Sequence, residues 1–165
     1  MPRSSLPRRK FLAMLGASAA VPLAAACSGG PAQAKSYPVT YSDAEWRRRL
    51  TPDQFEILRR KGTEVAGTSP LLHEKRPGTF VCVADGHPLF ASSTKYDSRT
   101  GWPSFWQAID KGAVGTSTDY LIGYPRTEVH CADCGGHLGH IFDDGPKPTG
   151  KRHCINGIAM DFRPA

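Results

Sequence analysis

Residues 128–142 read Glu-Val-His-Cys-Ala-Asp-Cys-Gly-Gly-His-Leu-Gly-His-Ile-Phe, in which two short β-type runs, 128–131 and 137–142, flank a turn-forming segment. Similar short runs, each bounded by Gly, Pro, Asp or Thr, occur at Phe80–Val83, Leu89–Ala91, Val114–Ser117, Tyr120–Gly123 and Ile158–Phe162. No helical periodicity separates these runs, so the pattern predicts a mainly β protein, either an antiparallel sheet or a small barrel. Asn156-Gly157 between two runs predicts a tight hairpin turn just after Cys154.

Two short helices are predicted before the first strand. Ser42 with Glu45, and Thr51-Pro52 with Gln54, both have the pattern of a capping box, which satisfies free backbone N–H groups where a helix begins. The second helix has a small apolar face, formed by Phe55, Ile57 and Leu58. We expect both helices to pack on the sheet and to carry no catalytic group.

The charge of the chain is concentrated at its N-terminus. The 165 residues have a formal net charge of +6, but residues 1–34 contain four basic residues and no acidic one. The remaining residues therefore contain 17 basic and 15 acidic side chains, a net charge of +2. Affinity for nucleic acid depends on clustered positive charge, so this nearly neutral remainder argues against a nucleic-acid partner.

Residues 1–34 have the three parts of an export signal: a positively charged start, an apolar stretch from Phe11 to Ala26, and a cleavage region of small residues. The start, Arg8-Arg9-Lys10-Phe11-Leu12, resembles a twin-arginine signal. The apolar stretch is shorter than the roughly 20 residues that cross a bilayer, and it contains Pro22. We therefore predict an exported protein, periplasmic or otherwise extracytoplasmic.

Two cleavage sites are possible in this leader. Ala32-Gln33-Ala34 fits release of a soluble protein, whereas Leu23-Ala24-Ala25-Ala26-Cys27 loosely resembles a lipoprotein site, which would leave a lipid anchor on Cys27. The predicted organisation is an export signal over residues 1–34, a linker over 35–41 and one domain over 42–165.

A structural zinc site is predicted from two similar spacings. Cys131-Ala132-Asp133-Cys134 has the knuckle spacing by which two thiolates reach one zinc ion, and Cys82-Val83-Ala84-Asp85 repeats it with a carboxylate in the last place. Cys82, Asp85, Cys131 and Cys134 would together complete a tetrahedral site. Two alternatives stay open: a Cys131–Cys134 disulfide in an oxidising compartment, and a Cys82 that is only a small buried side chain beside a turn-forming Asp85.

Cys154 is the candidate nucleophile. His153 and Arg152 precede it and Asn156 follows, and cationic or hydrogen-bonding neighbours favour the reactive thiolate. The alternative is an inert thiol in a buried strand. His137 and His140 are three residues apart, and this spacing alone fits either catalytic acids or zinc ligands.

Residues from about Ser42 to Pro164 resemble the B-type peptide methionine sulfoxide reductases, the methionine-R-sulfoxide reductases. The matching stretches are Leu89-Phe90, Thr94–Ser98, GWPSF at 101–105, EVHC at 128–131, HLGHIFDDGP at 137–146, Pro148-Thr149-Gly150 and RHCIN at 152–156. The resemblance implies two antiparallel sheets forming a small barrel-like core, with Cys154 as the nucleophile and His137 and His140 as catalytic residues. It also implies that oxidised proteins are the substrates and that a thioredoxin-like protein is the reductant, with no organic cofactor.

The side chains themselves suggest how such a reaction would run. A sulfoxide sulfur is electrophilic only when its oxygen is protonated or strongly hydrogen-bonded. We expect the Cys154 thiolate to attack the sulfur while His137, His140 and Asn156 hold and protonate the oxygen, leaving methionine and a Cys154 sulfenic acid. A further group is expected to bind the substrate: Trp102, whose flat ring can pack against the S-methyl group, and, by the resemblance, Phe142 and Arg152.

The chain departs from the family pattern at two positions. Many relatives have a resolving cysteine where this chain has Thr100, so an external thiol or another cysteine, with Cys82 as the candidate, would have to reduce the sulfenic acid. Zinc-bearing members have a fourth cysteine where this chain has Asp85. Two other functions fit parts of this sequence: a zinc-ribbon-like binding module, and a thiol peroxidase, which would need no aromatic pocket around Trp102.

Overall fold

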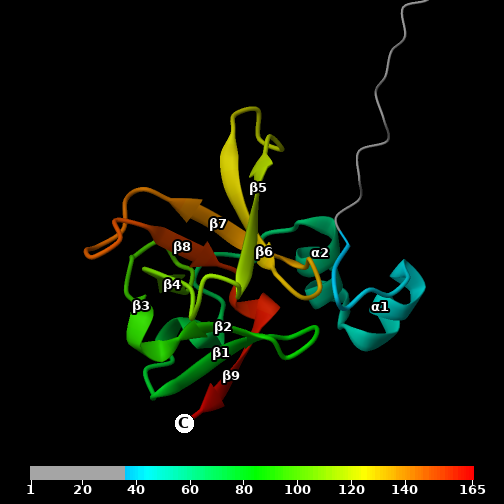
Figure 1. The fold of residues 1–165 in the computed structure, drawn as a ribbon, viewed down its shortest axis with the longest axis horizontal. Helices are drawn as coiled ribbons and strands as arrows, with labels where there is room; N and C mark the ends of the chain where they lie inside the picture. The colour runs from blue at the N-terminus through cyan, green and yellow to red at the C-terminus, as the bar shows by residue number, and fades with distance from the viewer. Residues whose placement is uncertain (1–35) are drawn as a thin grey trace, which may run out of the picture. The chain divides into compact units, whose positions relative to one another are not determined.

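The computed structural model describes residues 36–165 and contains two antiparallel sheets and two short α-helices (Figure 1). In the larger sheet the strand order is β3 (Lys95–Tyr96), β4 (Ser104–Phe105), β8 (Arg152–Ile155), β7 (His137–Phe142), β6 (Arg126–Cys131) and β5 (Val114–Asp119). In the smaller sheet it is β2 (Pro88–Ala91), β1 (Gly78–Cys82) and β9 (Met160–Pro164). Three short 3₁₀ helices occur in this part of the chain: η1 (Pro70–His73), η2 (Ser92–Thr94) and η3 (Gly157–Ala159).

The prediction of a mainly β protein with two antiparallel sheets is confirmed. Strands β3 and β5 form the two edges of the larger sheet, and within residues 36–165 no strand pairing joins them. The larger sheet is therefore open, and the barrel-like closure expected from the resemblance is not formed by these pairings.

The two sheets meet through three buried phenylalanines. Phe105 on β4 stacks on Phe90 of β2, with ring centroids 4.4 Å apart, and Phe80 of β1 meets the Phe105 ring edge-on at 4.9 Å. Burying each of these side chains stabilises the fold by roughly 1.5–3 kcal/mol. Successive residues of a strand point to opposite faces, so Ser104, next to Phe105, lies on the face of the larger sheet that is turned away from this core.

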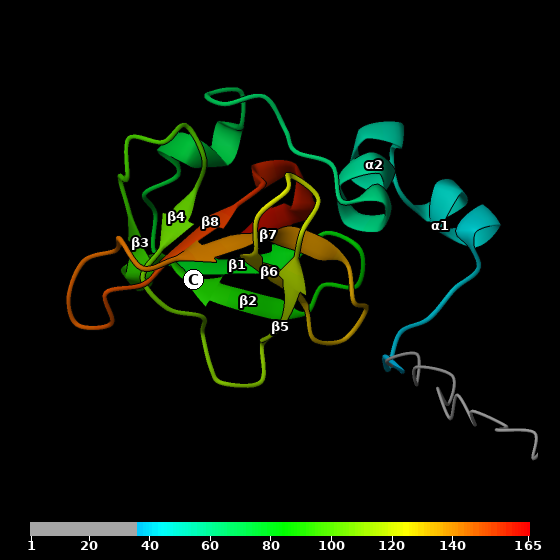
Figure 2. The ribbon, with the colours of Figure 1, turned by 90° about the horizontal axis from the view of Figure 1, so that it is seen from above.

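The helices α1 (Asp43–Arg49) and α2 (Pro52–Arg60) lie next to each other at one end of the described chain (Figure 2), and α2 packs against β7 and η3. The capping box predicted at Thr51 and Gln54 is confirmed in both of its hydrogen bonds. At the first helix only half of the box forms: the Ser42 hydroxyl accepts from the Glu45 N–H, while the Glu45 carboxylate pairs with Arg49. The predicted apolar face of α2 is buried.

Residues Tyr120–Gly123, predicted as a strand, are instead part of the turn that joins β5 to β6. The pairing of these two strands ends at Asp119 and Arg126, and the Gly123 N–H donates to the Tyr120 carbonyl to close a turn. Gly123 has a φ of +88°, which glycine adopts at little cost. Without a neighbouring strand to pack against, the β propensity of these residues did not produce a strand.

The hairpin predicted at Asn156-Gly157 is also wrong, because β8 and β9 belong to different sheets. Asn156 is the residue that precedes η3, and η3 leads the chain from one sheet to the other. Gly157 is needed for packing, since a Cβ there would collide with the Ser69 hydroxyl. Asn156 and Gly157 therefore occur here because of their tertiary contacts, and not because they form a hairpin turn.

Residues 36–41, predicted as a linker, pack on the domain: the Val39 N–H donates to the Asp133 carbonyl, and the Tyr37 ring contacts His130. No helix in residues 36–165 has the length and hydropathy needed to cross a membrane. The predicted export signal, with its two cleavage sites at Ala34 and Cys27, lies outside the described residues.

Candidate active site and metal centre

Five polar side chains form a row across the larger sheet. Strand pairing places Ser104 opposite Cys154, Cys154 opposite His140, His140 opposite Glu128, and Glu128 opposite Ser117. Paired residues of antiparallel strands point to the same face, with Cβ atoms about 4.5–5.5 Å apart. The row therefore aligns a thiol, an imidazole and a carboxylate on the face turned away from the phenylalanine core. Ser104 and Glu128 are buried and Cys154 is partly exposed, so the thiol is the accessible member of these three.

Cys154 lies at the end of a chain of hydroxyl groups. The Thr100 hydroxyl is 3.8 Å from the Cys154 sulfur, and the Ser98 hydroxyl bridges Thr100 and Ser104 at 2.8 and 2.7 Å. The structure thus brings position 100 against the candidate nucleophile, although the two residues are far apart in the sequence. A hydroxyl at this position can hydrogen-bond to the sulfur but cannot form a disulfide with it.

His153, expected as a polar neighbour of Cys154, lies on the opposite face of β8. Its Nδ1 is 3.2 Å from the Phe105 carbonyl oxygen and its ring contacts Phe90. Burial lowers the pKa of His153, so its imidazole is neutral near pH 7. Arg152, two residues before Cys154 on the same strand, is therefore the cationic neighbour that shares its face.

A β-bulge brings His137 and His140 to the same face. Residues three apart in a regular strand point to opposite faces, but β7 pairs His140 with Glu128, Gly139 with Val129 and then His137 with His130. One extra residue on β7 is accommodated in this way, and the two imidazole centroids lie 5.4 Å apart. Gly139 permits close approach of β8, because a Cβ there would collide with the Cys154 carbonyl oxygen.

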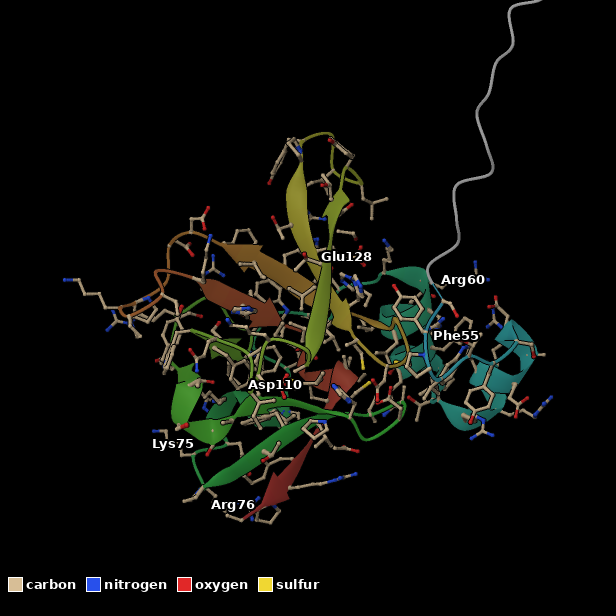
Figure 3. All side chains as sticks on the ribbon, viewed as in Figure 1. Phe55, Arg60, Lys75, Arg76, Asp110 and Glu128 are labelled. Carbon is tan, nitrogen blue, oxygen red and sulfur yellow. The ribbon has the colours of Figure 1, made fainter. Side chains whose placement is uncertain are left out.

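Glu128 lies on the larger sheet, where it is labelled in Figure 3. Its side chain holds His137 in place. Its carboxylate is 2.9 Å from His137 Nδ1 and accepts hydrogen bonds from Lys61 and Ser117, both at 2.7 Å. Burial alone would raise the pKa of Glu128, but the hydrogen bonds from His137, Lys61 and Ser117 hold it well below its ordinary value. An ionised carboxylate accepts, so Nδ1 of His137 carries a proton and Nε2 is the ring nitrogen left for chemistry.

His140 has a second carboxylate partner. Its Nε2 is 2.7 Å from Asp119, which also accepts from Arg126 at 2.6 Å and from the Leu121 backbone N–H at 2.7 Å. Hydrogen bonds lower the pKa of Asp119 to about 2: the bond from the Leu121 N–H has the largest effect, and those from His140 and Arg126 have smaller ones. Burial lowers the pKa of His140, and the bond to Asp119 opposes that shift. Each catalytic candidate therefore has one ring nitrogen on a carboxylate and one left for chemistry.

Asn156 is occupied by the protein backbone. Its side-chain oxygen accepts from the Glu64 N–H at 3.0 Å, and its amide nitrogen donates to the Leu138 carbonyl at 2.9 Å. The residue is 4% exposed. These bonds connect the segment after Cys154 to the bulge between the two histidines, an arrangement suited to positioning them.

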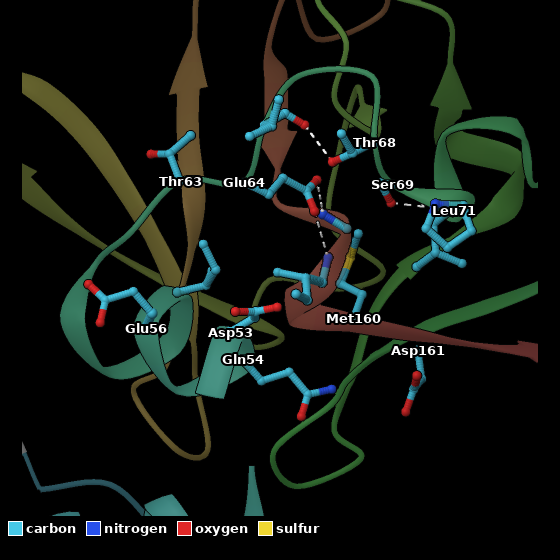
Figure 4. Close-up of a pocket in the computed structure, with 15 residues that line it drawn as sticks. Asp53, Gln54, Glu56, Thr63, Glu64, Thr68, Ser69, Leu71, Met160 and Asp161 are labelled. Atoms are coloured by element: carbon cyan, nitrogen blue, oxygen red, sulfur yellow. Dashed lines mark hydrogen bonds between the residues drawn. The ribbon is translucent and has the colours of Figure 1, made fainter. Parts of the chain in front are cut away.

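Glu64 bonds to Trp102, to Asn156 and to the chain segment that follows Cys154. The Trp102 indole N–H donates to the Glu64 carbonyl at 3.1 Å. The Glu64 carboxylate, labelled in Figure 4, accepts from the backbone N–H groups of Gly157 and Ile158 at 2.6 and 3.0 Å. Glu64 also lines a cavity of about 600 Å³ between α2, η1 and η3. One residue thus ties the expected aromatic wall of the site to the chain that follows Cys154.

Phe142 and Arg152 form the outer end of the same face. They are paired across β7 and β8, and the Arg152 guanidinium lies 4.3 Å above the centroid of the Phe142 ring. Arg152 also makes two hydrogen bonds to Asp144, at 2.8 and 2.7 Å, which raise the pKa of the guanidinium. The Phe142 ring is 6.5 Å from that of His140, so this pair borders the row of reactive groups.

The four predicted metal ligands are brought together by two turns of the same construction. Cys82 and Cys131 each accept at their carbonyl oxygen from a glycine N–H four residues later, Gly86 and Gly135, and both glycines have positive φ. The backbone N–H of each of these two cysteines donates to the carbonyl oxygen of the residue five positions later in the sequence. Asp85 therefore occupies, in the first turn, the position of Cys134 in the second.

The ligand atoms of this cluster fit a tetrahedral metal ion. The ligand atoms of Cys82, Asp85, Cys131 and Cys134 all lie within 4.8 Å of one another, and the Cys82 and Cys134 sulfurs are 3.8 Å apart. A Zn–S distance of about 2.3 Å implies a separation of about 3.8 Å between two sulfurs of a tetrahedron. The same separation is far too long for a disulfide, whose S–S bond is about 2.05 Å. His87 and Asp133, 2.9 Å apart, connect the two turns outside the cluster.

Comparison with known proteins identifies the family. The family model described as SelR domain matches residues 50–164. Peptide methionine sulfoxide reductase MsrB of Leptospira interrogans is 51% identical over 128 residues, which span 78% of this chain and 98% of that protein. The chain belongs to the methionine-R-sulfoxide reductase family.

Two further relatives of this family have similar sequence identity to the chain. The MsrB protein of Leifsonia xyli is 51% identical over 78% of this chain and 93% of its own length. Methionine-R-sulfoxide reductase B3, mitochondrial, of Mus musculus is 48% identical over 84% of this chain and 54% of its own length. The membership predicted from the GWPSF, HLGHIFDDGP and RHCIN motifs is confirmed.

Three residues of this methionine-R-sulfoxide reductase site were not singled out from the sequence: Glu64, Asp119 and Glu128. Glu128 carried a signal, because an acidic residue inside a β-type run must find a partner when it is buried. Asp119 and Glu64 lie beside loops, where acidic residues are common, and the sequence held no comparable signal for them.

Proposed function

We propose that this chain reduces methionine-R-sulfoxide in oxidised proteins to methionine, with Cys154 as the nucleophile. The observation that carries the proposal is the pairing of Cys154 with His140 across the sheet, with His137 bulged onto the same face and each imidazole held by a carboxylate. A thiol beside two imidazoles that can transfer protons is what the reduction of a sulfoxide requires.

The proposed step moves one oxygen atom and two electrons. The Cys154 sulfur attacks the sulfoxide sulfur to form a sulfur–sulfur bond, His137 and His140 supply protons to the oxygen, and the sulfur–oxygen bond breaks to release water. A water molecule then attacks the Cys154 sulfur, and the sulfur–sulfur bond breaks as the sulfide leaves. The products are the methionine sulfide and a Cys154 sulfenic acid, so the thiol is oxidised by two electrons and the sulfoxide is reduced by two. Family membership supports the R epimer as the substrate.

The surrounding residues are assigned to substrate binding and positioning. Trp102, anchored through its indole N–H to Glu64, offers an apolar wall to the S-methyl group, and the Phe142–Arg152 pair borders the row of reactive groups. We assign Asn156 to positioning instead of proton transfer, because both of its polar groups already bond to backbone atoms.

We further propose that Cys82, Asp85, Cys131 and Cys134 hold a structural zinc ion. The S–S separation and the two equivalent turns support this assignment, and four protein ligands leave no open position for substrate. Zinc there would tie the β1–β2 turn to the β6–β7 turn. Cys82 is 1% exposed and belongs to this cluster, which argues against its use as a resolving thiol.

Regeneration is proposed to proceed by direct attack of an external dithiol on the sulfenic acid. The Thr100 hydroxyl lies 3.8 Å from the Cys154 sulfur, and this residue has no thiol to offer. The first thiol of the reductant would form a mixed disulfide with Cys154 and release water, and its second thiol would free the enzyme. A thioredoxin-like protein is the proposed donor.

The leader of residues 1–34 supports an extracytoplasmic location, soluble after cleavage at Ala34 or lipid-anchored through Cys27.

The assignment is tested by replacing Cys154 with Ser and supplying the separate R and S epimers of a blocked methionine sulfoxide. The parent should consume the R epimer alone and, without reductant, leave a dimedone-reactive sulfenic acid on Cys154 with no new intramolecular disulfide. Cys154→Ser should be folded and inactive, because a hydroxyl is a far weaker nucleophile than a thiolate. Turnover by this variant, or equal rates on the two epimers, contradicts the proposal.

A further inference from the structure

The turn between β5 and β6 exposes four large apolar side chains. The exposed fractions are 66% for Tyr120, 73% for Leu121, 49% for Ile122 and 58% for Tyr124. The hairpin that carries them extends away from the rest of the larger sheet, at the top of Figure 1. We call residues 120–125 the hairpin tip. Leaving such a continuous apolar segment in water is unfavourable, and a concentrated apolar patch of this kind is typical of an interaction site.

The hairpin tip has a defined conformation. The Asp119 carboxylate accepts from the Leu121 N–H at 2.7 Å, and the Gly123 N–H donates to the Tyr120 carbonyl at 2.9 Å. Strand pairing continues to Asp119 and Arg126 at its base. The apolar side chains are thus held outward by a fixed turn, which reduces the entropy that a partner must overcome on binding.

The base of the hairpin tip is part of the active site. Asp119, the residue that precedes the tip, accepts from the Leu121 N–H with one oxygen and lies 2.7 Å from His140 with the other. His140 is the cross-strand neighbour of Cys154. A polypeptide whose oxidised methionine is at Cys154 must continue over the surface around that thiol, and the tip is directly connected to this surface.

The chemistry of the tip favours a polypeptide over a lipid surface. Residues 120–125 carry no charge, and Arg126 at the base is paired with Asp119 at 2.6 Å, so no free cation at this turn attracts anionic lipid. Methionine is itself a residue of protein interiors, and its sequence neighbours in such segments are commonly apolar. An oxidised and exposed segment therefore offers apolar side chains that match the tip.

We propose that the hairpin tip is the docking surface for the apolar residues that flank methionine sulfoxide in an extended polypeptide substrate. This inference rests on the proposed reaction at Cys154, and it adds a preference for apolar flanking sequence. It predicts that oxidised segments from protein cores are reduced more efficiently than free methionine sulfoxide or sulfoxide in a polar sequence.

The test compares three substrates: a blocked methionine-R-sulfoxide amide, a peptide with Leu, Val and Phe around methionine-R-sulfoxide, and a peptide with Ser and Gln in those places. The variant Ile122→Asn/Tyr124→Ser makes the tip polar, and Ile122→Val/Tyr124→Phe is the matched control that keeps it apolar. Both positions are exposed, so neither change affects the core. The polar variant should lose about 10-fold in kcat/KM on the apolar peptide, a loss in the range expected for one buried apolar side chain.

The polar variant should retain parental kcat/KM on the blocked amide and on the polar peptide, and the apolar control should match the parent on all three. Retained activity on the amide verifies the chemistry at Cys154 separately, so failure of the docking proposal is distinguishable from failure of the reaction. Equal losses on all substrates, or no loss on the apolar peptide, overturn the proposal. A variant that only weakens binding to phospholipid vesicles or self-association, with peptide kinetics unchanged, overturns it as well.

Discussion

Replacing Glu128 with Gln removes one charge from the site with almost no change in volume. The carboxylate is 4% exposed and bonds to His137, Lys61 and Ser117. A hydrogen bond to a charged group contributes about 1.5–3 kcal/mol, whereas a pair with a half-exposed lysine contributes about 0–1 kcal/mol. The expected loss in the free energy of unfolding is therefore about 2–3 kcal/mol, most of it from the buried bond to His137.

The same change should lower the rate of the chemical step. Without an ionised partner on Nδ1, His137 loses the hydrogen bond that orients its ring and fixes its tautomer. General acid catalysis, which depends on this ring, typically contributes about 10²–10⁴-fold. Because His140 remains, we expect kcat for a blocked R-sulfoxide to fall toward the lower limit, about 10²-fold. Single-turnover formation of the Cys154 sulfenic acid measures this step without the reductant, and urea unfolding measures the stability.

Lys61→Met is the matched control for Glu128→Gln, because it removes a cation from the same carboxylate and leaves the bond to His137 intact. It should keep kcat within about twofold and lose at most about 1 kcal/mol. A Glu128→Gln variant with more than half of the parental rate, or a Lys61→Met variant that is equally impaired, would refute the role of the carboxylate.

The pH dependence of stability has a definite sign. Folding lowers the pKa of Glu128, so the folded state holds its proton less tightly than the unfolded chain does. The stability contributed by this group is complete above the ordinary pKa of glutamate, about 4.3, and is lost progressively as the pH falls below it. The difference in stability between the parent and Glu128→Gln should therefore narrow as the pH falls below about 4.3.

Three further changes give distinct outcomes. Asp119→Asn removes the group that raises the pKa of His140, so the loss of kcat with increasing pH should begin at a lower pH; an unchanged pH profile contradicts the pairing. Gly139→Ala places a Cβ against the Cys154 carbonyl oxygen, and it should destabilise the fold by about 2 kcal/mol or more in urea unfolding. Protein prepared in a reducing cytoplasm should contain about one zinc ion per chain, and Cys131→Ser should lose it with a lower Tm; metal-free parent protein by elemental analysis would exclude the zinc site.

The metal cluster and the helix caps were predictable because each depends on residues close together in the sequence. A Cys-x-x-Cys spacing brings two ligands to one turn, and the glycine that follows Cys134 allows that turn. The Thr51–Gln54 box similarly needs only four consecutive residues. Bringing Cys82 to Cys134 depends on tertiary structure, and the sequence suggested this contact only through the repeated spacing.

The reactive row was not predictable at the same level. His140 and Cys154 become neighbours through the register of β7 and β8, and Glu128 joins them through β6. The spacing of His137 and His140 gave no indication of a bulge, without which the two rings would lie on opposite faces. The β-type run at Tyr120–Gly123 was misassigned because strand propensity reflects packing on a neighbouring strand, which this segment lacks.

The thiol of this protein is placed for reaction only when the larger sheet is correctly paired. The row that contains it consists of Ser104, Cys154, His140, Glu128 and Ser117. These residues come from five strands, so each pairing must be in register before the thiol meets its proton donors. A slip of a single residue in β8 would exchange Cys154 for His153 on the outer face and turn the thiol toward the phenylalanines. A chain paired in this wrong register would thus bury the Cys154 sulfur, and only the correctly paired sheet would expose that sulfur beside its proton donors.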